Sequence, residues 1–243
     1  MTRPLDRLFL LARQSIPALT GQEVFLNNDA DVNISRLVTV SDQKLIDLHL
    51  SLKQAHPETK ASYWRIRSWG LVNWQPIYLA MICVYQLGKV PMTLGRVKQT
   101  QQGVFVAGYG LENGEWLEGS HDQLIYLAAI QLKQILMSLE TIFGQLFDGK
   151  PVMYRALFVD QLLESLVQAS QLSLLSSKQV FNDAPIWIKA LGLSANALSG
   201  LNYRDNEVSF VRLTCCLHYQ RNDGDLCVSC PRLKAKKVVH VPT

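Results

Sequence analysis

The chain has 243 residues, of which 48% are hydrophobic and 18% charged, and its 24 lysines and arginines exceed its 20 aspartates and glutamates by four. This length and composition suit one compact domain, or two small ones, around a sizeable core. A net charge this small gives no reason by itself to expect binding to nucleic acid or anionic lipid, because such binding requires local clusters of Lys and Arg.

The apolar stretches predict no signal peptide and no transmembrane helix. The run at 8–12 is interrupted by Arg13, which leaves it too short for the core of a signal peptide. The longest run, at 76–88, falls short of the roughly 20 residues that cross a bilayer. We therefore expect a cytoplasmic protein, either free or peripheral at the inner membrane. In that reducing compartment, clustered thiols are more typical of metal or redox sites than of lasting disulfides.

Helices and a hairpin are predicted in the first half of the chain. Residues 1–39 are weakly patterned, whereas residues 40–56 place leucines at helical spacing behind Ser41, a candidate N-cap. The helical pattern continues over 62–88. Residues 89–110 then contain two β-branched stretches that flank Gln101-Gln102-Gly103, which predicts a β-hairpin.

The second half predicts further helices and one strand. Ser120 and Gln123 form a capping-box pattern ahead of apolar residues spaced by three and four, which predicts a long central helix up to Leu146. Pro151 is placed to open the next helix. Residues 184–201 predict a last helix, followed by a strand over 207–216.

The predicted fold class is therefore helix-rich α+β: a helical bundle with a β-hairpin or small antiparallel sheet and a C-terminal metal-binding segment. We expect a helix-rich substrate-binding region over 1–205 and the metal-binding segment over 206–243.

Four of the five cysteines lie close together near the C-terminus, at Cys215, Cys216, Cys227 and Cys230. The Cys-x-x-Cys turn is common to zinc and iron sites. The adjacent pair would point to opposite faces of an extended strand, so both thiols reach one metal centre only if the backbone bends. A dinuclear [2Fe-2S] cluster relaxes that demand, with Cys227 and Cys230 on one iron and the adjacent pair on the other. A four-thiolate zinc site remains the alternative, and a disulfide suits the compartment less well.

The order Cys-Cys-x10-Cys-x2-Cys, preceded by Arg212-x-Thr214 and followed by Pro231, resembles the signature of the FhuF-type ferric siderophore reductases. Looser similarity extends to 65–70 and 194–200, whereas the loop 217–226 holds a single glycine, fewer than that family's pattern suggests. The resemblance implies an oxidoreductase that passes one electron from a [2Fe-2S] cluster to an imported Fe(III)-siderophore. Release of Fe(II) for iron assimilation would follow.

Charged side chains around the cysteines are candidates for tuning and binding. Arg212, Arg232 and Lys234 add positive charge, which would raise the potential of an anionic cluster and attract an anionic chelate or an acidic electron donor. His218 is a candidate for a hydrogen bond to a cluster sulfur or for proton delivery. The four thiols, however, already complete the ligand set.

Arg65, Arg67 and Trp69 combine cations with an aromatic face, a chemistry that suits an organic chelate, although aromatic residues at helical spacing belong more often to the core. The glycines at 108–114 do not have the spacing of a dinucleotide site. Electrons are therefore expected from an external donor, such as a ferredoxin or an NAD(P)H-dependent reductase.

Two other classes of protein remain open. One is an iron–sulfur redox or iron sensor, and the other is a binding module whose zinc fastens the C-terminal tail. No basic recognition helix is evident, so no nucleic-acid partner is expected.

Overall fold

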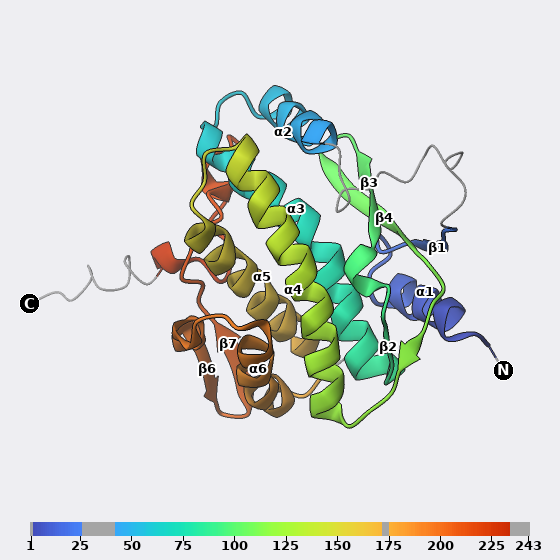
Figure 1. Cartoon of the computed structure of the whole chain (residues 1–243). Coiled ribbons are helices and arrows are strands. Elements are labelled where there is room, and N and C mark those ends of the chain that lie inside the picture. The colour runs from blue at the N-terminus through green and yellow to red at the C-terminus, as the bar shows by residue number, and fades with distance from the viewer. Residues whose placement is uncertain (1, 26–41, 172–174, 234–243) are drawn as a thin grey trace, which may run out of the picture.

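The computed structural model describes residues 2–25, 42–171 and 175–233. Within these ranges, α-helices form the body of the protein and three small β-sheets lie around it (Figure 1). The α-helices are α1 (Pro4–Ser15), α2 (Asp42–Ala55), α3 (Ala61–Ile82), α4 (His121–Leu146), α5 (Pro151–Gln171) and α6 (Ser177–Leu191). The strands are β1 (Gly21–Glu23), β2 (Val90–Pro91), β3 (Lys98–Gln102), β4 (Phe105–Leu111), β5 (Trp116–Leu117), β6 (Leu201–Arg204) and β7 (Glu207–Phe210). The predicted helix-rich α+β class is confirmed.

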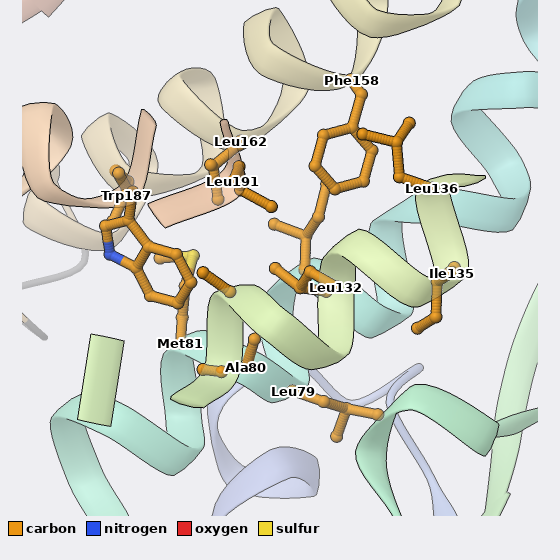
Figure 2. Close-up of a cluster of buried hydrophobic side chains, with 14 of the residues drawn as sticks. Leu79, Ala80, Met81, Leu132, Ile135, Leu136, Phe158, Leu162, Trp187 and Leu191 are labelled. Carbon is orange, nitrogen blue, oxygen red and sulfur yellow. The ribbon is translucent and has the colours of Figure 1, made fainter. Parts of the chain in front are cut away.

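The long helix α4 runs through the middle of the bundle and supplies much of the core (Figure 1). Its capping box is present as predicted, since the Ser120 hydroxyl accepts a hydrogen bond from the backbone N–H of Gln123. Side chains from α3, α4, α5 and α6 meet in one apolar cluster (Figure 2). The labelled members are at most 4% exposed: Leu79, Ala80, Met81, Leu132, Ile135, Leu136, Phe158, Leu162, Trp187 and Leu191. Each large apolar side chain buried in this way stabilises the fold by about 1.5–3 kcal/mol.

The helical segment predicted over 62–88 is confirmed. Helix α3 ends at Ile82, a π-helical turn over Cys83–Leu87 continues it, and Gly88 ends that turn with a left-handed φ of 69°. Cys83 is fully buried and packs in the core. The predicted hairpin is also confirmed, because β3 and β4 pair antiparallel around a turn at Gly103, whose φ is 60°.

Two elements near the N-terminus were not predicted. Helix α1 packs its buried Leu5, Leu8 and Ala12 against the core. Strand β1 pairs parallel with β4, which makes β1-β4-β3 a mixed sheet. The candidate N-cap Ser41 lies outside the described residues.

The last predicted helix is wrong in its bounds. Helix α6 begins after Ser176, whose side chain forms a capping box with Gln179, and it ends at Gly192, where a left-handed φ of 70° stops the helix. Residues 195–200 form a 3-10 turn, and β6 starts at Leu201.

The predicted strand over 207–216 is also too long, because β7 ends at Phe210. Strands β6 and β7 form a hairpin around Asp205 and Asn206, which both have a positive φ. The boundary drawn between residues 205 and 206 therefore falls in the turn of this hairpin. Among the described helices, none is both long enough and apolar enough to span a bilayer.

Candidate metal centre and the adjoining cavity

The four C-terminal cysteines lie in the irregular segment after β7, which runs beside α5 (Figure 1). None of them is in a disulfide. Cys230 is 2% exposed, whereas Cys215, Cys216 and Cys227 are half-buried. The Sγ atoms of Cys216 and Cys227 are 3.6 Å apart. Thiols from the two halves of the motif therefore lie side by side, and the assignment of each cysteine to an iron stays a prediction.

The backbone around the cysteines bends sharply in two places. Leu217, directly after Cys216, has a left-handed φ of 58°, which turns the chain away from the line of β7 just past the adjacent pair. In the Cys-x-x-Cys turn, the Cys230 N–H donates to the Cys227 carbonyl at 3.0 Å. The Cys216 and Cys227 thiols that touch each other thus lie next to these two bends.

The single glycine of the intervening loop stands where the loop closes on itself. A Cβ on Gly224 would collide with the carbonyl oxygen of His218, so only glycine fits without a shift of the backbone. The loop also rests on the connection between α2 and α3, since the Asn222 N–H donates to Glu58 Oε1 at 3.3 Å.

Two carboxylates of α5 together contact the two cysteine-bearing stretches, Asp160 the first stretch and Glu164 the second. Asp160, which is 1% exposed, accepts hydrogen bonds from the backbone N–H groups of Leu213, at 3.0 Å, and of Thr214, at 2.6 Å. One turn later, Glu164 accepts a hydrogen bond from the hydroxyl of Ser229, which lies between Cys227 and Cys230. Sequence reasoning missed both carboxylates, because their partners are backbone and hydroxyl groups that carry no recognisable pattern.

The donor set, four cysteine thiols, is the one that a [2Fe-2S] cluster uses. Burial raises the pKa of Cys215, and burial together with the neighbouring Cys216 raises the pKa of Cys227 to about 12. These thiols must therefore lose protons when a metal binds. Among the described residues, no three His, Cys, Asp or Glu side chains converge on one point that could hold one ion. A [2Fe-2S] cluster is held by two thiolates at each of two irons, and the segment offers four thiols.

These features define a protein with a four-thiol metal centre held by a helical bundle. Residues 212–232 match the family model described as the FhuF 2Fe-2S C-terminal domain. The match spans Arg212, all four cysteines and Arg232, and it confirms the resemblance drawn from the cysteine spacing. It also identifies the cofactor as a [2Fe-2S] cluster instead of a zinc ion.

A cavity of about 650 Å³ lies directly against the cysteine segment. Of the four cysteines, Cys216 and Cys227 line it, while Cys215 and Cys230 do not. Its walls come from α3, the β3–β4 hairpin, α5 and the C-terminal segment, and they include Arg67, Trp74, Phe105, Gln161, Glu164 and Arg212. Sequence reasoning gave no signal for Gln161 or Phe105, which reach the cavity only through the packing of α5 and the hairpin.

Besides Arg212, three predicted side chains line this cavity, namely Arg67, Trp69 and His218, and their surroundings differ. Trp69 is 1% exposed and packs against Phe143 and Tyr154, so most of its ring belongs to the core. Arg67 is half-buried, and no carboxylate of the described residues forms an ion pair with it. Because its guanidinium is largely removed from water, the pKa of Arg67 is lowered.

His218 also lines the cavity, with a pKa that burial and the nearby Arg221 and Arg67 lower below its usual value. A neutral imidazole at this position can still donate or accept a hydrogen bond. Positive charge in the cavity comes from the arginines.

The remaining predicted residues lie elsewhere. Arg65 donates to the carbonyls of Phe147 and Asp148, at 3.0 and 3.1 Å, and is not among the cavity residues. Arg232 stacks on the ring of Tyr219, with its guanidinium carbon 4.2 Å from the ring centre. Lys234 lies outside the described residues.

Proposed function

We propose that the protein is a ferric-siderophore reductase, which takes one electron from an external donor and passes it through a [2Fe-2S] cluster to an Fe(III)-siderophore. The observation that carries this proposal is the position of the cavity: Cys216 and Cys227, two of the four candidate ligands, form part of its wall. A cavity of about 650 Å³ has the size of a site for an organic ligand.

When bound, a [2Fe-2S] cluster supplies one electron at a time, which matches the need of one ferric ion. Siderophores hold Fe(III) through hard oxygen donors, and the lower charge of Fe(II) weakens that binding, so reduction releases the iron. Arg67 and Arg212 would attract an anionic chelate, while the faces of Trp74 and Phe105 would pack against its organic framework. These side chains bind and orient the substrate, and protons for its freed oxygens come from water.

We further propose that the protein acts in the cytoplasm, where imported siderophores arrive, and receives electrons from a ferredoxin or an NAD(P)H-dependent reductase. No dinucleotide-binding pattern is evident in the sequence, which supports an external donor.

The proposal is tested with anaerobically purified, cluster-loaded protein. Absorption and EPR spectra are recorded before and after one-electron reduction with dithionite, and an Fe(III)-siderophore is then added to the reduced protein together with a chromogenic Fe(II) chelator. We expect the cluster signal of the reduced form to disappear as Fe(II) appears, in a one-to-one ratio. The matching Ga(III)-siderophore has the same shape but cannot be reduced, and it should leave the reduced cluster unchanged.

Variants connect this reaction to the cysteine segment. Cys227→Ser should abolish the cluster and leave the helical far-UV circular dichroism intact, whereas Cys83→Ala, in the buried core, should keep the cluster spectrum. A reduced cluster that persists in the presence of several Fe(III)-siderophores would refute the reductase and favour a sensor. Zinc without iron in the purified protein would favour the binding module.

A further inference from the structure

Asp160 is a buried acidic residue among apolar residues of α5. Its neighbours Phe158, Val159 and Leu162 are at most 3% exposed, so the carboxylate is costly unless polar groups surround it. Those groups come from the chain just before the first cysteines: two backbone N–H groups, of Leu213 and Thr214, and the hydroxyl of Thr214 at 2.5 Å. The Arg212 Nε atom lies 3.8 Å from the same carboxylate.

Glu164 makes the corresponding contacts with the second cysteine stretch. It lies on the same face of α5 as Asp160, because residues four apart on a helix are neighbours. Its carboxylate accepts from the Ser229 hydroxyl, and its second oxygen is 3.5 Å from Arg212 Nη1. The backbone N–H of Arg212 also donates to the Ser229 carbonyl at 2.9 Å, which connects the two stretches with each other.

This network uses only protein groups, so it does not require a metal to form. Leu213 and Thr214 are beyond the end of β7, and their N–H groups bond to Asp160 instead of continuing the β-ladder. The two stretches that carry the cysteines are thus attached to one rigid helix at points one turn apart. The Arg-x-Thr and Cys-x-Ser-Cys patterns provide the donors that Asp160 and Glu164 accept.

We propose that Asp160 and Glu164 are positioning residues for the metal centre, which fix Arg212–Thr214 and Ser229 on α5 before the cluster is inserted. They also set part of the charge around it. Negative charge near an anionic cluster disfavours its reduction, while Arg212 opposes this effect. The inference concerns assembly and potential, so it does not depend on the identity of the substrate.

Preorganisation is tested on the full-length, metal-free protein by hydrogen exchange of peptides that cover 211–216. We expect the amides of Leu213 and Thr214 to be protected in the wild type. In Asp160→Asn, exchange should accelerate by about tenfold or more, because the amide nitrogen cannot accept and a hydrogen bond to a charged group is lost. Wild-type amides that exchange at the rate of an unstructured chain would overturn the proposal.

The charge effect is tested by redox titration of the cluster-loaded proteins. Asp160→Asn and Glu164→Gln should both raise the reduction potential, a result that a purely structural role would not give. Glu164→Gln is the variant less prone to disturb the fold, since the Glu164 side chain is 25% exposed and the glutamine oxygen can still accept from the Ser229 hydroxyl. The matched control is Asp183→Asn, which removes another buried carboxylate, 2.7 Å from His121 on α4.

Asp183→Asn should lower thermal stability without changing either the exchange of 211–216 or the potential. If the potential of Glu164→Gln equals that of the wild type, or if Asp183→Asn raises the potential as much as Glu164→Gln does, the tuning role is refuted. Loss of siderophore reduction has no bearing on these measurements, so a failure of the proposed function and a failure of this inference are distinguishable.

Discussion

Arg67 offers the sharpest test of the cavity, because its charge has no partner within the described structure. The side chain is half-buried beside Cys216 and His218, and burial lowers its pKa. A guanidinium in such a place destabilises the empty protein, since its lost hydration is not replaced by an ion pair. We expect Arg67→Met, which keeps an apolar side chain of similar reach, to weaken binding of an anionic chelate without destabilising the fold.

The magnitude follows from the loss of one charge-assisted hydrogen bond to the ligand. Such a bond contributes about 1.5–3 kcal/mol, and each 1.4 kcal/mol changes a dissociation constant about tenfold, so the Kd should rise about 10- to 140-fold. The melting temperature should stay the same or increase. The affinity of the wild type should also decline more steeply with salt than that of the variant, because a charge contributes to it.

Arg65→Met is the matched control, two residues away on the same helix. It removes hydrogen bonds to the carbonyls of Phe147 and Asp148. We expect a loss of about 1.5–3 kcal/mol of stability. For a chain of this size, that corresponds to a melting temperature about 3–12 °C lower. The Kd for the chelate should not change, because Arg65 does not line the cavity.

The assay is isothermal titration calorimetry with a Ga(III)-siderophore that carries free carboxylates, so that no reduction accompanies binding. Melting temperatures of the ligand-free proteins are measured alongside. The reasoning fails if Arg67→Met binds the chelate as tightly as the wild type. It also fails if Arg67→Met is destabilised as much as Arg65→Met, because Arg67 would then have a structural partner.

Two further predictions concern packing. A Cβ on Gly200 would collide with the Val211 carbonyl oxygen, so Gly200→Ala should displace the chain before the cysteines. The iron content per protein should therefore fall. Gly144→Ala, whose new Cβ would meet nothing within 4 Å, should keep the iron content of the wild type. Phe158→Ala should destabilise the core by about 3–5 kcal/mol and lower the melting temperature by about 6–20 °C. Val152→Ala, at a side chain that is 70% exposed, should change stability by less than about 0.5 kcal/mol in thermal denaturation.

The sequence predicts best where structure depends on neighbours in the chain. The capping box of Ser120 and Gln123 and the hairpin turn at Gly103 are local, and both are confirmed. The same signal was available for α6, because Ser176 and Gln179 form a capping box, but the apolar pattern after Ala184 drew the predicted start too far along the chain. Gly192 then ends the helix earlier than the apolar pattern suggests.

Contacts between distant segments could not be predicted in this way. The partners of Asp160 are two backbone N–H groups and one hydroxyl more than fifty residues away, and no sequence pattern connects them with Asp160. Arg65 and Arg67 have the same chemistry and were grouped for that reason. Residues two apart on a helix point about 200° from each other, so only the packing of α3 decides which one lines the cavity.

Because both cysteine stretches are attached to α5, we do not expect the C-terminal segment to form its metal centre when it is moved to another protein alone. A graft of residues 206–243 onto another scaffold would carry Arg212, Thr214 and Ser229 without the carboxylates that receive them. The transplanted unit would need to include the helix that holds Asp160 and Glu164, although that helix lies outside the stretch that matches the family. A working transfer of this centre therefore requires two parts. One is the C-terminal segment, which the family pattern identifies, and the other is α5, which that pattern does not include.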